Sequence, residues 1–394
     1  MKEIKRGIFF LFCFFASSVL YSQESKFTCG QYVEFYRASL DQIRSIEANC
    51  IDYMKGRCDE SLLEFDKEPN GIASTYHWFY DFETDKEYIK TLDPHFAGDG
   101  MTIDGCEDKT AGYNGDSYYS FSHKRNSGRR RRDKYDEYGI SYMRRGLFPI
   151  SLLGLNAFTS QRRTVIDVLE EEKENLDLIL PDNGDIILHC LFQNYGETGE
   201  LFVTLDPRHG FLPKHIEQYK APFNVLVWKL EVFNFIEAKP GIWFPVRGQS
   251  EGFYMEKPIL EDGVHYANGM TFEEIEALPE EEQWKIIPTL GFRSIPHETG
   301  PTVLMVNSET LKINEPFDES LLTLDRFPDG MYVWDDILQL GYKVGRFDDP
   351  NYVGAAKTET WWTVVRILLI AVGTVIVCLG IGLHLKKRFA ARTE

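Results

Sequence analysis

The spacing of hydrophobic and polar residues predicts one helix near the start of the chain, followed by a long series of β-strands. Between Gly30 and Ile46, apolar residues recur at helical intervals and charged residues occupy the opposite side. Beyond this helix, short runs of alternating apolar and polar residues are separated by Gly, Asn, Asp and Pro, which is typical of β-hairpins. Asn114-Gly115 is the strongest of these turn signals. The pattern therefore predicts a long antiparallel meander.

Two short helices are predicted to interrupt the strands. Thr164 is followed by Asp167, and Thr271 by Glu274, which is the spacing of a capping box at a helix N-terminus. An antiparallel sheet hides one apolar face, and a sheet of this length twists and curls. We therefore predict an α+β fold in which a long curved antiparallel sheet wraps on helices that close its concave face.

Large apolar side chains form a row on each of two predicted strands. Because alternate residues of a strand point to the same face, the members of each row share one side of the sheet. If the sheet curls, both rows line its concave side, where they either fill a core or wall a cavity for an apolar ligand. The candidate ligand-binding residues are Tyr76, Trp78, Tyr80 and Phe82 in one row and Leu226, Trp228 and Leu230 in the other.

The N-terminus has the pattern of a secretory signal peptide. Lys2, Lys5 and Arg6 precede an apolar stretch that is too short to span a membrane, and small and polar residues follow it. The expected cleavage follows Ser22, with Ser18 as the alternative.

The C-terminus has the pattern of a single membrane-spanning helix. Residues 367–383 carry no charge, and a helix needs about 20 apolar residues to cross a bilayer. Trp361 and Trp362 stand where interfacial aromatic residues occur, and the basic tail after Leu385 predicts a cytoplasmic C-terminus.

The two terminal signals divide the chain and predict its location. We expect a signal peptide (1–22), an exported domain (23–345), a short stalk (346–360), a transmembrane helix (361–385) and a cytoplasmic tail (386–394). The protein would then be a single-pass protein of the cell membrane, with its large domain on the exported, periplasmic side and the lipid bilayer as a partner of its C-terminal helix.

The net charge restricts the partners, and one basic cluster departs from it. The chain carries a formal charge of −18, which argues against nucleic acid as a ligand. Arg129, Arg130, Arg131 and Arg132 stand in a row within this acidic background. The first interpretation is a solvated loop paired locally with Asp133, Asp136 and Glu137; the second is a loop that binds phosphates or acidic polymers, since guanidinium groups suit such anions.

The cysteines allow at most two disulfide bonds outside the cytoplasm. Five cysteines lie between the terminal segments, and none of their spacings is of the metal-binding CxxC type. A helix from Gly30 climbs about 24 Å, and a following antiparallel strand returns about 30 Å. This geometry would bring Cys58 level with Cys29, so we predict a Cys29–Cys58 disulfide in an oxidising compartment.

No sequence motif indicates catalysis. Nucleophile-elbow, zinc-protease, P-loop and dinucleotide-binding motifs do not occur in the sequence, and His77, His123 and His189 fall in strand patterns that favour structural roles. The sequence therefore predicts no catalytic residue, no metal site and no cofactor, and it does not predict an enzyme.

The order of elements and several local phrases resemble the lipoprotein-carrier superfamily, the LolA/LolB-like half-barrels and their uncharacterised exported bacterial members. These phrases include "GYNGDSYYSF" at the Asn-Gly hairpin, "LDPRHGFLPKHIEQY" at a strand and turn, and "GIWFPVRGQ" at a late hairpin. The resemblance implies an eleven-stranded half-barrel wrapped on helices, with an apolar cavity that receives acyl chains in relatives.

Three functional hypotheses follow. The first is a non-enzymatic, membrane-tethered binding domain for an apolar ligand (lipid or lipoprotein acyl chain) or for a partner protein of the envelope. The second is a structural or envelope-organising protein whose core is filled. The third, a hydrolase of envelope polymers, has the least support because no set of catalytic residues converges in the sequence.

Overall fold

The structure is a computed structural model that describes residues 27–344 with internal gaps. The residues of this range that it does not describe are 66–72, 97–102, 133–148, 156–162, 195–196, 259, 261–262, 267–268, 299 and 323–326. The predicted signal peptide (1–22), stalk (346–360), transmembrane helix (361–385) and tail (386–394) also lie outside the described residues.

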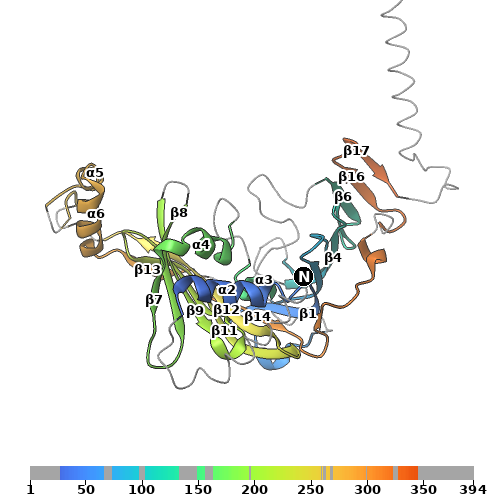
Figure 1. The fold of residues 1–394 in the computed structure, drawn as a ribbon. Coiled ribbons are helices and arrows are strands. Elements are labelled where there is room, and N and C mark those ends of the chain that lie inside the picture. Colours follow the sequence, from blue (N-terminus) through green and yellow to red (C-terminus); the bar gives the residue numbers. More distant parts are fainter. Residues whose placement is uncertain are drawn as a thin grey trace, which may run out of the picture. The chain divides into compact units, whose positions relative to one another are not determined.

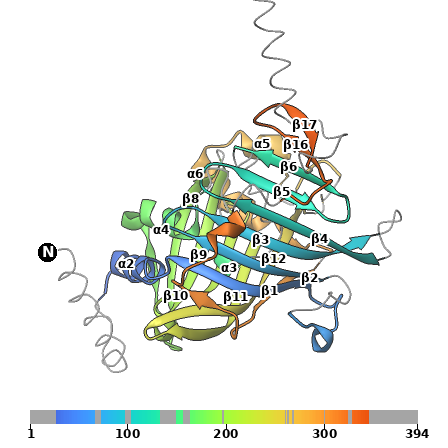
Figure 2. The ribbon, with the colours of Figure 1, turned by 90° about the vertical axis from the view of Figure 1, so that its right-hand side faces the viewer.

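The residues predicted as one exported domain fall into two compact units. Of the described residues, those between 27 and 118 and between 149 and 322 belong to unit 1, and those between 119 and 132 and between 327 and 344 belong to unit 2. Unit 1 contains most of the strands and the helices, and it is shown in Figures 1 and 2 from two sides.

Unit 1 is built on one long sheet, in which each described strand pairing is antiparallel. Its strand order is β7-β8-β9-β10-β11-β12-β14-β1-β2-β3-β4, with β13 pairing along the end of β12 and β15 along the start of β1. The bounds of these strands are β1 Ser45–Met54, β2 Ala73–Asp81, β3 Glu87–Phe96, β4 Ile103–Tyr113, β7 Asp177–Ile179, β8 Ile186–Asn194, β9 Glu197–Asp206, β10 Leu212–Lys220, β11 Val225–Lys239, β12 Ile242–Glu256, β13 Arg293–Pro296, β14 Thr302–Val306 and β15 Lys312–Ile313.

The helices of unit 1 are short. They are α2 Cys29–Leu40, α3 Pro149–Leu152, α4 Val165–Glu171, α5 Phe272–Glu276 and α6 Glu280–Ile286, with 3-10 turns η1 Glu60–Leu62, η2 Lys173–Asn175, η3 Pro207–His209, η4 Ile287–Leu290 and η5 Glu319–Leu322. The capping boxes predicted at Thr164 and Thr271 are both present. The leading helix ends at Leu40, earlier than predicted, because the strand β1 begins at Ser45.

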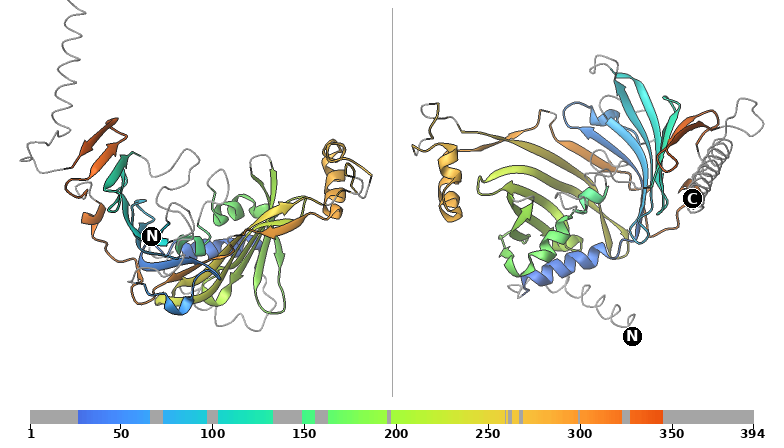
Figure 3. Two further views of the ribbon diagram at one scale, coloured as in Figure 1. Left: turned by 180° about the vertical axis from the view of Figure 1, so that it is seen from behind. Right: turned by 90° about the horizontal axis from the view of Figure 1, so that it is seen from above.

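One face of the curved sheet packs against α2, α3 and α4, which lie on the same side of it (Figure 3). The main hydrophobic core fills this interface and includes the fully buried Tyr36, Trp78, Leu152 and Leu230. Gly248 of β12 permits the contact with α3, since a Cβ there would lie 2.6 Å from Leu152 Cδ2 and from the carbonyl oxygen of Glu231. The helices therefore cover the apolar face that the sequence pattern predicted.

The opposite face of the sheet carries two smaller apolar clusters. Ile51, Tyr53, Ala73 and Val303 form one of them, against which Phe65 and Met305 pack. Phe79 forms the other with Tyr88 and Leu322, and its ring stacks on Phe317 at a centroid distance of 3.7 Å. In β2, Tyr76, Trp78 and Tyr80 point to the main core, and Phe79 points to the opposite face. Phe79 is apolar because this second face is covered as well.

Unit 2 is a small sheet with its own core. Its strands are β5 Tyr118–Ser122, β6 Ser127–Arg131, β16 Tyr332–Asp335 and β17 Leu340–Lys343. β16 pairs with β6 in parallel and with β17 in antiparallel orientation. The buried residues of this core are Tyr119, Phe121, Phe327, Met331 and Val333.

The structure corrects the predicted fold class. The strands are not all antiparallel, because β6 and β16, which are far apart in the sequence, pair in parallel. Among the described residues, helices are limited to a few short segments, and far more residues lie in strands, whose pairings are of mixed direction. The transmembrane helix and the single-pass localisation are not supported either. In the described part of the chain, no helix has the length and apolar composition to cross a membrane.

A buried carboxylate fixes the turn between β9 and β10. Asp206 is 2% exposed and accepts hydrogen bonds from the backbone N–H of Arg208 at 3.0 Å and from its Nε at 3.1 Å. The Nδ1 of His209 lies 2.9 Å from the same carboxylate. Burial alone would raise the pKa of Asp206, but the hydrogen bonds from Arg208 and His209 outweigh it and hold the pKa below its ordinary value. The turn is thus stabilised by the ionised form.

We predict that Asp206 makes the protein sensitive to acid. Because the pKa of Asp206 is depressed in the folded state, its contribution to stability is present above the unfolded pKa of about 3.9 and is lost as the pH falls through the folded value. Asp206→Asn should therefore be less stable at neutral pH and lose less stability on acidification than the wild type. Urea unfolding at about pH 7 and about pH 3 tests this.

The exposed turn residue Asp182 offers the matched control, Asp182→Asn, which should behave like the wild type at both pH values. An equal acid-induced loss in Asp206→Asn and in the wild type would contradict the assignment.

Candidate functional site

The two rows of apolar residues predicted to bind a ligand are brought together in the main core. Tyr76, Trp78 and Leu230 are buried there, with exposed fractions of 5%, 0% and 0%. Tyr80, Phe82 and Trp228 are partly buried and pack against the same cluster. Leu226 is also partly buried. The two rows thus share one apolar interior, as the alternation predicted.

The polar atoms of these aromatic residues have partners within the protein. Trp78 Nε1 donates a hydrogen bond to Glu87 Oε1 at 2.9 Å, and Glu87 is itself completely buried. Tyr80 donates to Asp85 at 2.8 Å, and Trp228 Nε1 donates to Ser250 Oγ at 2.8 Å. A fully buried indole with a satisfied N–H group, as at Trp78, is the arrangement expected of packed core.

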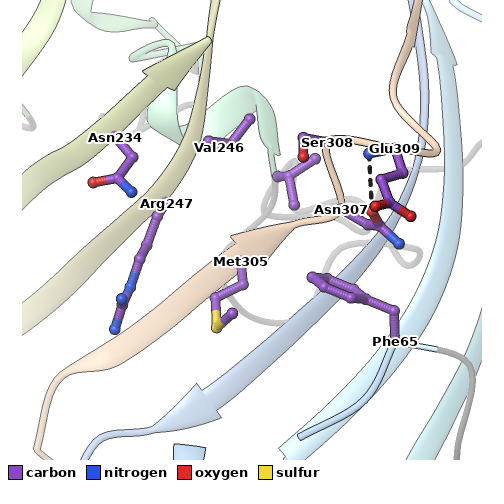
Figure 4. Close-up of a pocket in the computed structure, with 9 residues that line it drawn as sticks. Phe65, Asn234, Val246, Arg247, Met305, Asn307, Ser308 and Glu309 are labelled. Carbon is purple, nitrogen blue, oxygen red and sulfur yellow. Dashed lines mark hydrogen bonds between the residues drawn. The ribbon is translucent and has the colours of Figure 1, made fainter.

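An open pocket lies elsewhere in unit 1, where β12 and β14 separate (Figure 4). The two strands pair from Arg247 opposite Met305 to Ser250 opposite Thr302. On the other side of Arg247, β12 continues along β11, whereas β14 ends at Val306 and turns through Asn307 towards β15. Because the strands β12 and β14 diverge here, the sheet has a gap between them.

The pocket measures about 430 Å³ and combines apolar walls with a polar rim. This volume falls within the range of about 300–1,000 Å³ that is typical of small-molecule sites. Val306 belongs to the main core, and Met305 packs on the cluster of the opposite face, so the pocket borders both apolar layers. Its lining residues are Phe65, Asn234, Val246, Arg247, Met305, Val306, Asn307, Ser308 and Glu309.

Arg247 supplies the positive charge of this pocket. Its Nη2 donates to Glu60 Oε2 at 2.7 Å, and the two side chains are 37% and 43% exposed. Glu60 belongs to η1, in the segment that also brings Phe65 to the pocket wall. Tyr53 lies close to this pair: burial and the Glu60 carboxylate raise the pKa of Tyr53 to about 12, and Arg247 opposes that shift.

The predicted arginine cluster is tied to distant aspartates in unit 2. Arg129 forms a two-point ion pair with Asp336 at 2.6 and 3.1 Å, and Arg131 contacts the same carboxylate at 3.0 Å. Arg130 donates to the buried Asp335 at 3.1 Å. The hydrogen bonds from Arg129 are the main reason why the pKa of Asp336 lies below its ordinary value. Burial acts in the opposite direction.

The arginine cluster therefore has partners that the sequence interpretation did not identify. Arg132 is exposed at the end of β6. The partners predicted from the sequence, Asp133, Asp136 and Glu137, lie outside the described residues. The ion pairs with Asp335 and Asp336 join β6 to the end of β16, next to the parallel pairing of these strands.

The predicted Cys29–Cys58 disulfide is not formed in the structure. Cys29 carries a free thiol that donates to the carbonyl of Leu176 at 3.3 Å, and burial chiefly raises the pKa of this thiol. Cys58 packs instead against the cluster around Ile51 and Tyr53. The physical reason is the direction of α2, which packs on α4 and β10 rather than back along β1.

Two of the three histidines named in the sequence analysis, His77 and His189, are paired with carboxylates away from the pocket. His189 contacts Asp177 through Nδ1 at 3.1 Å and Glu200 through Nε2 at 2.9 Å, and its ring stacks on Phe202. His77 Nε2 lies 3.0 Å from Glu47. The contacts of His189 with Asp177 and Glu200 tie three neighbouring strands together.

The pocket residues are those that the sequence interpretation missed. They come from four separated segments, which the register of the sheet brings together. The one local signal is Arg247, a lone cation inside the otherwise apolar strand phrase "IWFPVRG". Nothing near Phe65 or Met305 in the sequence indicates that they meet there.

Comparisons with known proteins concern the fold. No protein-family model matches the chain, and no curated protein matches it. A DUF1329 family protein from Desulfovibrio piger ATCC 29098 is similar in structure, with a TM-score of 0.38 and 10% identity over 76% of this chain and 98% of that one. A putative outer membrane lipoprotein-sorting protein domain from Vibrio parahaemolyticus has a TM-score of 0.35 and 12% identity over 76% of this chain and 99% of that one.

We predict that Trp78 contributes to stability as packed core. Trp78→Ala should lower the free energy of unfolding by about 3–5 kcal/mol, because it leaves a cavity and removes the hydrogen bond to Glu87. Urea denaturation of the full chain measures this.

Phe233, which is 46% exposed, provides the comparison: Phe233→Ala should change stability by about 0.5 kcal/mol or less. A similarly small loss for Trp78→Ala would mean that this residue walls an open cavity instead.

Proposed function

We propose that this protein is a non-enzymatic binding domain for an apolar ligand, of the type of a lipid or lipoprotein acyl chain. The pocket between β12 and β14 carries this proposal. Ligand sites are typically concave and mainly apolar, with a few polar groups that fix the orientation of the ligand. Val246, Met305 and Phe65 offer apolar contacts, and Arg247 and Asn307 stand among the polar ones.

The position of the pocket supports an acyl chain as its ligand. Val246 packs against the main core, whereas Met305 and Phe65 pack on the opposite face. A flexible chain placed between them would exchange water for apolar contacts on both sides, which is worth about 0.8 kcal/mol per buried methylene group. Methionine adapts its shape to such ligands because its side chain is unbranched.

The similar solved structures add a weaker argument of analogy. One of them is described as a lipoprotein-sorting domain, and the sequence phrases resemble the same superfamily. In this chain, however, the aromatic rows predicted to wall the cavity are largely part of the core. We therefore place the proposed ligand at the gap between the strands and not between the two rows.

The alternative of a structural protein with a filled core rests on a specific observation. The rows that include Trp78 and Leu230 are packed against α2, α3 and α4 with full burial. Such a protein would need no ligand, and binding measurements separate the two functions.

We predict that the full chain binds decanol, an uncharged ligand with a single alkyl chain, in a one-to-one complex. Met305→Trp should abolish this binding, because the larger ring would occupy the pocket that Met305 lines. Native mass spectrometry of the protein with and without decanol detects the complex, and thermal unfolding checks that the variant is folded.

A matched tryptophan substitution controls for the added ring. Leu191 is 42% exposed on β8 and does not line the pocket, so Leu191→Trp should bind decanol like the wild type. If Met305→Trp still binds decanol, the ligand does not bind in this pocket. If the wild type binds no decanol, the proposed function fails and the filled-core alternative stands.

A further inference from the structure

The guanidinium group of Arg247 has an unused donor at the pocket. Its Nη2 is bonded to Glu60, but its Nε–H is buried and has no hydrogen-bond partner in the described part of the chain. A buried donor without an acceptor is unfavourable, and a guanidinium group can donate two parallel hydrogen bonds to one acid group. Arg247 is therefore equipped to take an additional anionic acceptor.

A second polar atom near Arg247 is in the same situation. The hydroxyl of Tyr53 is buried beside Glu60 and Arg247, which both act on its pKa, but no hydrogen bond of ordinary geometry joins it to a described residue. Tyr53 lies on β1, and its partner in the ladder, Val303, is itself paired with Gln249 on β12. Tyr53 and Arg247 thus stand on strands on either side of β14, and each has a donor to offer.

The arrangement of charges gives the pocket a direction. Arg247 and Glu309 lie on opposite sides of Met305 in Figure 4, with apolar side chains between them. The backbone N–H of Glu309 donates to Asn307 Oδ1 at 2.9 Å, so the loop that carries this carboxylate has a defined conformation. An acid group would be attracted to the Arg247 side and repelled from the Glu309 side.

We infer that the pocket takes a single-chain amphiphile whose anionic head, a carboxylate or a phosphate, binds Arg247. This inference rests on the proposed function and adds the class of ligand. The alkyl chain lies along Met305 and Val246, and the head group receives hydrogen bonds from the guanidinium group. Arginine suits both acid groups, since its planar fork matches their oxygens.

Glu60 is the internal competitor for this head group. Its carboxylate occupies one edge of the guanidinium group at 2.7 Å, and it belongs to the same segment as the pocket residue Phe65. An anionic ligand either shares Arg247 with Glu60 or displaces it. Removal of the Glu60 charge should therefore strengthen the binding of acids and leave the binding of neutral ligands unchanged.

The test compares three ligands with the same chain and different heads: decanol, decanoate and decyl phosphate. The wild type should bind both acids about tenfold or more tightly than decanol, in keeping with a charge-assisted hydrogen bond. Arg247→Met, which keeps the apolar stem, should bind all three like decanol. Glu60→Gln should bind the acids several-fold more tightly and decanol as before. Acetate and inorganic phosphate, which lack the chain, should not compete.

A control variant removes a similar charge on the neighbouring strand. Lys229 of β11 pairs with Glu251 at 2.9 Å and does not line the pocket, so Lys229→Met should retain the preference for acids. If acetate or inorganic phosphate competes with the two acids, Arg247 binds free anions, and the inference of an amphiphilic ligand is wrong.

The remaining outcomes distinguish this inference from the proposed function. Equal binding of decanol and decanoate by the wild type, or a preference for acids that persists in Arg247→Met, would overturn the anionic head and leave the apolar-ligand function standing. If Glu60→Gln binds the acids no more tightly than the wild type, Glu60 does not compete with the head group for Arg247. Binding of none of the three ligands would overturn both.

Discussion

The large sheet depends on β14, which lies between β12 and β1 and pairs with both. The strands β7 to β12 form one series of neighbouring hairpins, and β1 to β4 form another. β14 pairs with the last strand of the first series and with the first strand of the second. Because β14 has only five residues, its hydrogen bonds join two large assemblies over a short contact.

The same short contact explains why the pocket lies where it does. β11 and β12 have fifteen residues each, whereas β14 can accompany β12 only briefly. β12 must therefore leave β14, and the backbone that leads to β15 takes a different path along β1. The side chains at the point of departure, Arg247 and Met305, line a pocket because the pairing of β12 with β14 does not continue beyond them.

Local features of the structure could be predicted from the sequence. The capping boxes at Thr164 and Thr271 and the turn at Asn114 depend on residues within three or four positions of one another. The Oδ1 of Asn114, for example, accepts hydrogen bonds from the N–H groups of Asp116 and Ser117. The shared face of the two apolar rows followed from the period of the strands.

Long-range features could not be predicted in the same way. The partners of Arg129 and Arg130 lie more than two hundred positions away, and the parallel pairing that brings them together leaves no local pattern. A row of alternating aromatic residues looks the same whether it fills a core or walls a cavity. The distinction at Trp78 comes from α2, α3 and α4, whose packing against the sheet decides how much space remains.

The gap between β12 and β14 has a mechanical consequence. Opening a pocket within a continuous sheet would break ladder hydrogen bonds, whereas here the ladder already ends at Arg247 and Met305. The turn after Val306 can be displaced relative to β12 while β12 remains paired with β11 and β15 remains paired with β1. No ladder hydrogen bond has to break for this displacement, so we expect the proposed ligand site to tolerate chains of different lengths more readily than different head groups.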